Sequence, residues 1–81
     1  MNNKELWKKF LDNIKLEITN VSFETWFNED DTKFYSFDDG IVTITVNQNY
    51  IKKHLEEHYL DQMMEVMRKI TNIDVSFNIL L

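Results

Sequence analysis

Two histidines four residues apart are the strongest candidates for chemistry in this sequence. The segment His54-Leu55-Glu56-Glu57-His58 matches the H-x-x-E-H pattern of inverted zinc peptidases. Residues four apart share one face of a helix, so both imidazoles can reach one metal ion. A catalytic zinc ion also needs a third protein ligand and an open position in a cleft, and the chain has no other histidine and no cysteine. We therefore interpret His54 and His58 as ordinary helix residues and predict no metal site and no cofactor.

Other catalytic arrangements are also missing from the sequence. No serine stands in a strained glycine elbow, and the absence of cysteine removes thiol chemistry. The paired acids Asp30-Asp31 and Asp38-Asp39 fall in segments predicted to be solvated loops, which do not provide the environment of an acid–base catalyst. The single glycine, Gly40, excludes the glycine-rich loops that bind nucleotide phosphates. We predict that the chain is not an enzyme.

Length and composition predict one globular domain over residues 1–81. Hydrophobic residues make up 43% of the chain, which is enough for a packed core. The N-terminus lacks the apolar segment of a signal peptide, and no apolar run approaches the roughly 20 residues that span a bilayer. Because cysteine is absent, no disulfide can form. We expect a cytoplasmic protein with no membrane partner.

The charge distribution limits binding to nucleic acids. Fourteen acids against nine bases give a net charge of −5, whereas a protein that binds phosphates needs a clustered excess of bases. The bases form only short pairs, at Lys8-Lys9, Lys52-Lys53 and Arg68-Lys69. We predict negligible affinity for duplex DNA and at most weak binding of single-stranded DNA through one local face.

The first third of the chain predicts two helices. Asn2 and Glu5 form a capping pair at the start of the first helix. Its apolar residues then recur every three or four positions, at Trp7, Phe10, Leu11, Ile14 and Ile18. After a break at Thr19-Asn20, a short second helix is expected to carry Phe23, Trp26 and Phe27 on one side. The acidic segment 28–32 is predicted to be a loop.

The rest of the chain predicts a hairpin, a long helix and a strand. Residues 33–37 and 41–46 read as two strands joined by a turn at Asp38-Asp39-Gly40. A third helix is predicted from Gln48 to Thr71, and Asn72 can adopt the left-handed conformation that ends a helix. Its apolar stripe consists of Ile51, Leu55, Tyr59, Met63, Val66, Met67 and Ile70. A final half-buried strand is expected to begin at Ile73, where apolar and polar residues start to alternate.

The predicted order α-α-β-β-α-β describes an α+β fold in which a three-stranded sheet packs with three helices. This outline is similar to that of KH domains, which clamp a nucleic-acid backbone with a Gly-x-x-Gly loop. Gly40 is the only glycine, so that loop is absent. A similar outline therefore does not carry the KH binding activity to this chain.

Several short motifs occur in a fixed order along nearly the whole chain, from Leu6 to Phe77. They are Leu6-Trp7, Phe10-Leu11, Ile14, Ser22-Phe23-x-Thr25-Trp26, Val42-x-Ile44 and the segment from Tyr50 to Tyr59. This ordered set resembles domain I, the N-terminal domain, of the bacterial chromosomal replication initiator DnaA. The sequence departs from the family at two points. Asn47-Gln48-Asn49-Tyr50 replaces a Pro-Asn-x-Phe turn, and His54 stands where the family usually has a tryptophan.

The resemblance implies two interaction surfaces. A partner-binding face would be formed by the second helix and the start of the third, with Ser22, Phe23, Thr25, Trp26, Asn49, Tyr50 and Ile51 at the matching positions. Some of these residues must belong to the core, and Phe23 is the first candidate. An exposed edge at Leu6 and Trp7 would support weak self-association. Taken on their residue types alone, Trp7 and Trp26 fit a core position as well as an interface.

The resemblance further implies a protein–protein interaction module of a replication initiator, which recruits the replicative helicase and initiation regulators. Two alternatives are a free-standing regulator that competes for these partners, and a weak single-stranded nucleic-acid-binding module in which Lys8, Lys9, Lys52 and Lys53 share a face. The chain ends inside or just after an apolar strand, at Ile79-Leu80-Leu81. That ending favours a domain cut from a longer protein.

Overall fold

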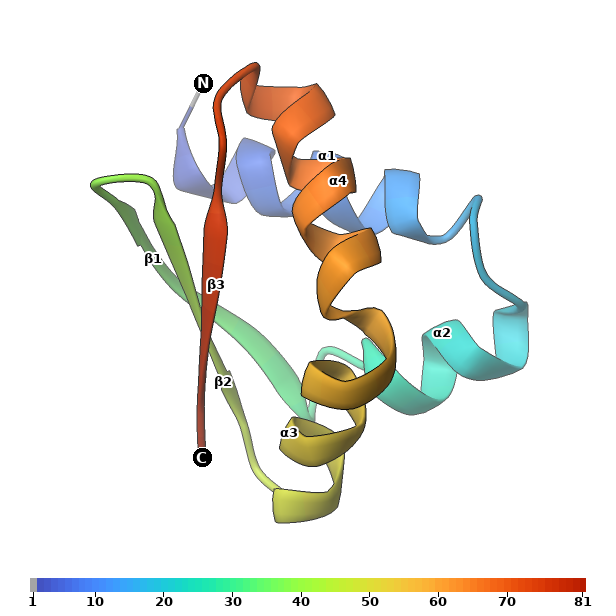
Figure 1. Cartoon of the computed structure of the whole chain (residues 1–81). Coiled ribbons are helices and arrows are strands. Elements are labelled where there is room, and N and C mark those ends of the chain that lie inside the picture. Colours follow the sequence, from blue (N-terminus) through green and yellow to red (C-terminus); the bar gives the residue numbers. More distant parts are fainter. Residues whose placement is uncertain (1) are drawn as a thin grey trace.

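The structure, a computed structural model, describes residues 2–81 and confirms the predicted α+β fold and its order of elements (Figure 1). The elements are α1 (Asn3–Ile14), α2 (Asn20–Trp26), β1 (Thr32–Asp38), β2 (Ile41–Val46), α3 (Asn49–His54), η1 (Leu55–Tyr59), α4 (Leu60–Thr71) and β3 (Ser76–Leu80). The segments α3, η1 and α4 follow one another without a break and form the predicted third helix, with a π-helical turn at η1.

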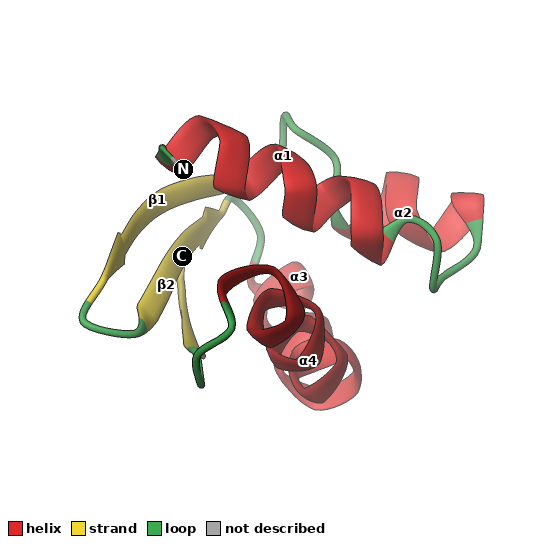
Figure 2. Ribbon diagram, turned by 90° about the horizontal axis from the view of Figure 1, so that it is seen from above, coloured by secondary structure: helices red, strands yellow, loops and turns green. Residues whose placement is uncertain are grey.

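The three strands form one mixed sheet in the order β1-β2-β3, in which β1 pairs antiparallel and β3 pairs parallel with β2. The helices lie against one face of this sheet, and the other face is open (Figures 1 and 2). Val42 pairs with Phe77 and Ile44 with Ile79, so the apolar residues of neighbouring strands lie side by side. The predicted inward direction of Val42, Ile44 and Val46 is confirmed, because all three are buried.

One extra residue in β1 brings two phenylalanines to the same face of the sheet. Phe34 pairs with Ile44 and Ser36 with Thr43, which leaves Tyr35 as a bulge. In a regular strand, Phe34 and Phe37 would face opposite sides because they are three residues apart. The extra residue shifts the alternation of side chains by one position. Both phenylalanine rings therefore pack against the core, and Tyr35 remains 71% exposed.

The π-helical turn at η1 has a similar effect on the long helix, because it brings apolar side chains from both ends of the helix onto one face. In an uninterrupted α-helix, Met63 would point about 120° away from Ile51, which it follows by twelve residues. The wider turn at η1 absorbs one residue and reduces this offset to about 20°. Ile51 and Leu55 can therefore enter the same core as Met63, Val66 and Met67, and all five side chains are buried.

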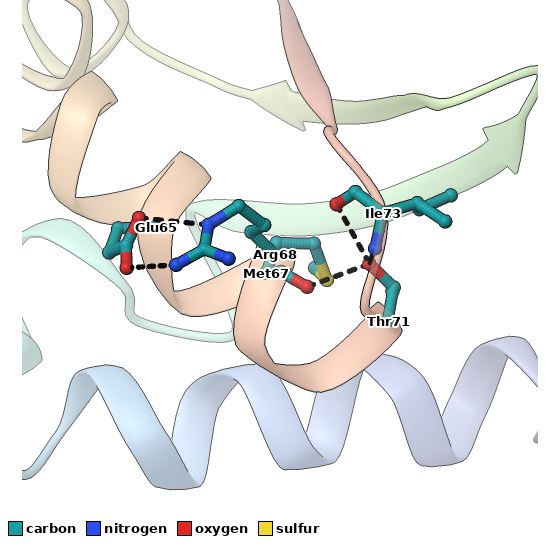
Figure 3. Close-up of polar contacts among 5 residues, drawn as sticks. All are labelled: Glu65, Met67, Arg68, Thr71 and Ile73. Atoms are coloured by element: carbon teal, nitrogen blue, oxygen red, sulfur yellow. Dashed lines mark hydrogen bonds and ion pairs between the residues drawn. The ribbon is translucent and has the colours of Figure 1, made fainter.

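Local hydrogen bonds confirm the predicted start of the first helix and the predicted end of the third. The first helix is shorter than its apolar spacing predicts, because α1 ends at Ile14 and Ile18 lies in the segment that follows. The Asn2 side chain accepts a bond from the Glu5 amide at 2.8 Å and caps α1. At the other end of the long helix, Asn72 has a φ of 63° and its amide bonds the Arg68 carbonyl at 2.7 Å. Figure 3 shows this last turn, where the Thr71 hydroxyl donates to the Met67 carbonyl at 2.9 Å.

The last strand is shorter than the alternating pattern predicts. It begins at Ser76 instead of Ile73, and Ile73 is 49% exposed. The reason is that the residues after Asn72 leave the helix through a turn and reach the sheet only near Val75, which is buried. Gly40, at a φ of 77° in the hairpin turn, accepts a bond from the Ser76 amide at 2.9 Å and fixes this entry point.

The core lies between the sheet and the helices. Phe10 is its central ring, because it is fully buried and packs against three other aromatic rings. Its ring centroid lies 4.9, 6.1 and 5.6 Å from those of Trp7, Phe27 and Phe77. Within residues 2–81, no helix combines the length and the apolar character needed to cross a membrane.

Candidate functional site

A threonine hydroxyl holds each end of α2 in place. Thr19 accepts a bond from the Ser22 amide at 3.1 Å and caps the first turn of α2. The Thr32 hydroxyl donates to the Trp26 carbonyl at 2.9 Å, and Thr32 is only 2% exposed. Because a buried hydroxyl needs a partner, this bond fixes the last residue of α2 against the start of β1.

The start of α3 is tied to the same region. The Asn47 side chain donates to the Asp31 carboxylate at 2.9 Å, and the Asn47 amide donates to the Asp31 carbonyl at 3.1 Å. Ile51, in the first turn of α3, is fully buried and anchors the helix in the core. The two elements that flank the hairpin in sequence therefore meet at one end of the molecule (Figure 1).

Three rings meet where α2 and α3 approach each other, and we call Trp26, Tyr50 and His54 the aromatic cluster. The indole of Trp26 lies parallel to the His54 imidazole, with ring centroids 3.7 Å apart and an interplanar angle of 12°. Tyr50 meets Trp26 edge to face at 6.2 Å. Both geometries are favourable for aromatic pairs. These contacts join the last residue of α2 to α3.

The aromatic cluster is only partly covered by the protein. Tyr50 is 60% exposed, whereas Trp26 and His54 are half-buried. Thr25 and Asn49, next to the cluster in sequence, are exposed. A large ring held on an ordered backbone and open to solvent has the properties of an interface anchor, since tyrosine and tryptophan dominate the binding energy of many interfaces.

The surroundings of His54 favour the neutral form of its imidazole. Burial lowers the pKa of His54 below its usual 6.5, and the neighbouring His58 lowers it further, while the Glu57 carboxylate acts in the opposite direction. The His54 and His58 rings are 4.7 Å apart. Within residues 2–81, no three His, Asp or Glu side chains come together in a way that could hold a metal ion.

Two of the predicted partner-binding residues point elsewhere. Ile51 is fully buried, so the expectation that it lies on the binding face is wrong, whereas Phe23 packs against the core as a partly buried residue. Phe23 is half-buried, packs on Phe27 at 6.1 Å and lies 5.4 Å below the Lys15 ammonium. Of the predicted partner-binding residues, the structure brings Trp26 and Tyr50 into contact, while Thr25 and Asn49 are exposed beside them in the sequence and Ser22 is half-buried on α2.

The predicted exposed edge at Leu6 and Trp7 needs correction. Leu6 is 4% exposed because it lies on the inner face of α1 with Phe10 and Ile14, so it cannot form such an edge. Trp7 is half-buried and stacks on Phe10 at 4.9 Å with an angle of 12°. Of these two residues, only Trp7 keeps part of its surface exposed.

His54 is the member of the aromatic cluster that the sequence did not predict. Its spacing to His58 matches a metal-binding pattern, whereas in the structure its ring stacks on the Trp26 indole. The resemblance offered a signal, because it implies an aromatic residue at position 54. A flat ring at this position can stack on Trp26, as the imidazole does.

A separate hollow of about 330 Å³ lies between α1, α2 and the acidic loop. It is lined by Leu11, Phe23, Glu24, Phe27, Asn28, Glu29 and Asp30. None of the three rings of the aromatic cluster lines it. The candidate site is therefore a partly exposed surface and not an enclosed pocket.

Comparisons with known proteins agree on one family. The DnaA N-terminal domain matches residues 4–69, which include all of α1 but its first residue, α2, the hairpin, α3, η1 and most of α4. The chain is 32% identical over 76 residues to the chromosomal replication initiator protein DnaA of Microcystis aeruginosa, covering 94% of this chain and 17% of that protein. It is 26% identical over 77 residues to the corresponding protein of Synechocystis sp., covering 95% and 17%.

A third relative, the chromosomal replication initiator protein DnaA of Crocosphaera subtropica, is 25% identical over 71 residues, which cover 88% of this chain and 15% of that protein. The chain thus spans less than one fifth of the length of these curated relatives. The matched range contains both tryptophans and the whole aromatic cluster. On these grounds, the chain belongs to the family of DnaA N-terminal domains.

Proposed function

We propose that this domain is a protein–protein interaction module of a bacterial replication initiator, which recruits the replicative helicase and initiation regulators through the aromatic cluster. Thr25 and Asn49 would form the polar rim of this docking surface. The observation that carries the proposal is the 60% exposure of Tyr50 on a helix start that is packed against Trp26. Membership of the DnaA N-terminal domain family supports the same conclusion.

The geometry favours binding because the surface is ordered before a partner arrives. Trp26 is fixed by its stack on His54 and by the Thr32 bond to its carbonyl. An anchor that is already held in position loses little conformational freedom on binding, so more of its contact energy contributes to affinity. Tyr50 presents an apolar ring and a hydroxyl to the partner, which is the combination enriched in interfaces.

Each docking event is expected to be weak because the surface is small. Several domains joined in one oligomer of the initiator would raise the local concentration of binding sites and multiply this affinity. The exposed part of Trp7 would support weak self-association of the domain in the same way. No step of this proposal requires a nucleotide, a metal ion or a catalytic residue of this domain.

A capture experiment tests the proposal. The immobilised 81-residue domain is incubated with a lysate of the source cell, and the replicative helicase is identified by mass spectrometry. We expect the wild type to capture the helicase and Trp26→Ala to lose it, with both proteins folded by circular dichroism. Equal capture of the helicase by Trp26→Ala and wild type would contradict the proposed surface.

A further inference from the structure

His54 is the most closely packed ring of the aromatic cluster. Its imidazole lies 3.7 Å from the Trp26 indole, and it also contacts the rings of His58 at 4.7 Å and Tyr59 at 5.5 Å. Imidazole differs from the other rings because one proton converts it from a flat neutral aromatic into a cation. The half-buried position of His54 makes that change consequential for Trp26.

We infer that His54 is a positioning residue of the docking surface: its neutral imidazole holds the Trp26 indole in place, and protonation of His54 weakens both this stack and the binding of a partner. This inference rests on the proposed function, because it concerns the same surface. It adds a proton-dependent control that the aromatic residue usual in the family would not provide.

Charged groups around His54 act in both directions. From η1, the Glu57 carboxylate attracts an imidazolium, whereas His58 repels it when both histidines are protonated. From α2, the facing group is the Trp26 indole, whose π face also attracts a cation. Burial removes water from the imidazolium and so opposes protonation. This is the largest of the effects on the pKa of His54.

Other titratable groups of the same helix lie near His54 in the sequence. Lys52 and Lys53 precede it directly, and Tyr50 lies one turn before it. The pKa of His54 is lowered by burial and by His58, so the neutral ring is the form that the folded cluster favours. As the pH falls below the usual histidine value of about 6.5, the cluster must accept a charge that it does not favour.

The response of the stack can be measured without any partner. In a Trp7→Phe background, Trp26 is the only indole, so its fluorescence reports on the ring that covers it. The His54 ring protons are followed by NMR over the same range, from about pH 8 to about pH 5. We expect one shared midpoint below 6.5, and His58→Gln should move it upward because a repelling charge is removed. A His54 midpoint above 6.5 would show that the indole and Glu57 stabilise the cation, and it would overturn the inference.

The effect on binding is measured with the purified replicative helicase of the same organism. We expect the affinity of the wild type to fall severalfold between about pH 7.5 and about pH 5, because the lowered pKa of His54 places its protonation below the usual value of about 6.5. His54→Phe keeps a flat ring that cannot be protonated, so whatever its affinity at neutral pH, it should retain that affinity in acid. His54→Ala should bind more weakly at both pH values.

The comparison between wild type and His54→Phe cancels any titration of the helicase itself. If both proteins lose affinity to the same extent in acid, His54 does not control binding and the inference is wrong, while the proposed function stands. If the wild type does not bind the helicase even at neutral pH, the proposed function is wrong and the inference falls with it.

Discussion

Trp7 and Trp26 are both half-buried, yet they contact side chains of different chemistry. Trp7 stacks on Phe10, which is fully buried, and tilts against Phe34 at 5.7 Å. Trp26 stacks on His54 and meets the exposed Tyr50. The neighbours of Trp7 are hydrocarbon rings that continue into the core, whereas those of Trp26 carry polar or titratable atoms and lead to the surface.

This difference separates two roles that the residue type alone does not distinguish. A ring packed on buried phenylalanines contributes mainly to the free energy of unfolding, because its contacts exclude water on the inside of the domain. A ring packed on amphipathic neighbours at the surface adds less to stability and leaves contact area for a partner. We therefore expect substitutions near Trp7 to affect folding most and substitutions near Trp26 to affect binding most.

The largest effect on stability is expected at the centre of the Trp7 region. Phe10→Ala removes a fully buried ring that contacts three other aromatic residues, and it should lower the free energy of unfolding by roughly 3–5 kcal/mol. Chemical denaturation followed by circular dichroism measures this change. A loss of less than about 1 kcal/mol would show that the Trp7 region is not continuous with the core.

Trp7 itself should have a smaller but clear effect on folding. Trp7→Ala leaves Phe10 and Phe34 without their covering ring, and because Trp7 is half-buried we expect a loss of about 2 kcal/mol of stability. Trp7→Phe keeps a ring on Phe10 and is the matched control, with a loss of less than about 1.5 kcal/mol. Sedimentation equilibrium of Trp7→Phe also tests self-association, which should weaken if the exposed part of Trp7 forms the contact.

The Trp26 region depends on a polar contact that has no counterpart beside Trp7. Thr32→Val has almost the same shape as threonine but cannot donate to the Trp26 carbonyl. We expect a loss of about 1–2 kcal/mol of stability, because the carbonyl at the end of α2 is left without this bond. Thr43→Val, on the open face of β2, is the control and should change stability little. Equal effects of the two substitutions would mean that the Thr32 bond does not fix Trp26.

The smallest expected effect is a dependence of stability on pH. The pKa of His54 is lowered in the folded state, so its contribution to stability is complete above about pH 6.5 and is lost as the pH falls through the folded value. The pKa of Glu65 is also lowered, because Arg68 donates hydrogen bonds to its carboxylate, but that contribution is lost only below its usual 4.5 (Figure 3). Thermal melts between these two pH values should show a decline for wild type that is smaller in His54→Phe.

The order of elements could be predicted from the sequence because periodicity and turn residues are local signals. Asn2, Gly40 and Asn72 mark their helix ends and their turn through backbone chemistry that needs no tertiary information. Ile73 was misplaced because alternation continues before the chain reaches the sheet, and pairing with β2 begins only at Ser76.

The bulge in β1 and the π turn in the long helix were not predicted, although the spacing of apolar residues carries a trace of each. Ile51, Leu55, Tyr59 and Met63 are spaced by four residues, which exceeds the α-helical period and is relieved by the π turn. Phe34 and Phe37 have a spacing that no regular strand can bury on one face. The pattern shows a mismatch, and only tertiary packing decides which residue is the extra one.

The site could be predicted at the level of elements but not of single side chains. Trp26, Tyr50, Thr25 and Asn49 follow from the family resemblance, and their meeting point is where α2 and α3 are in contact. The burial of Ile51 and Leu6 depends on the direction in which each helix faces the sheet, which spacing alone does not determine. The stack of His54 on Trp26 is likewise a contact between segments far apart in sequence.

The most direct test of the docking surface compares two exposed tyrosines. Tyr50 is 60% exposed in the aromatic cluster, and Tyr35 is 71% exposed on the bulge of β1. We expect Tyr50→Ala to fold normally and to lose about 2 kcal/mol or more of binding energy for the replicative helicase in titration calorimetry, whereas Tyr35→Ala should bind like the wild type. Wild-type affinity in Tyr50→Ala, or an equal loss in Tyr35→Ala, would contradict the account.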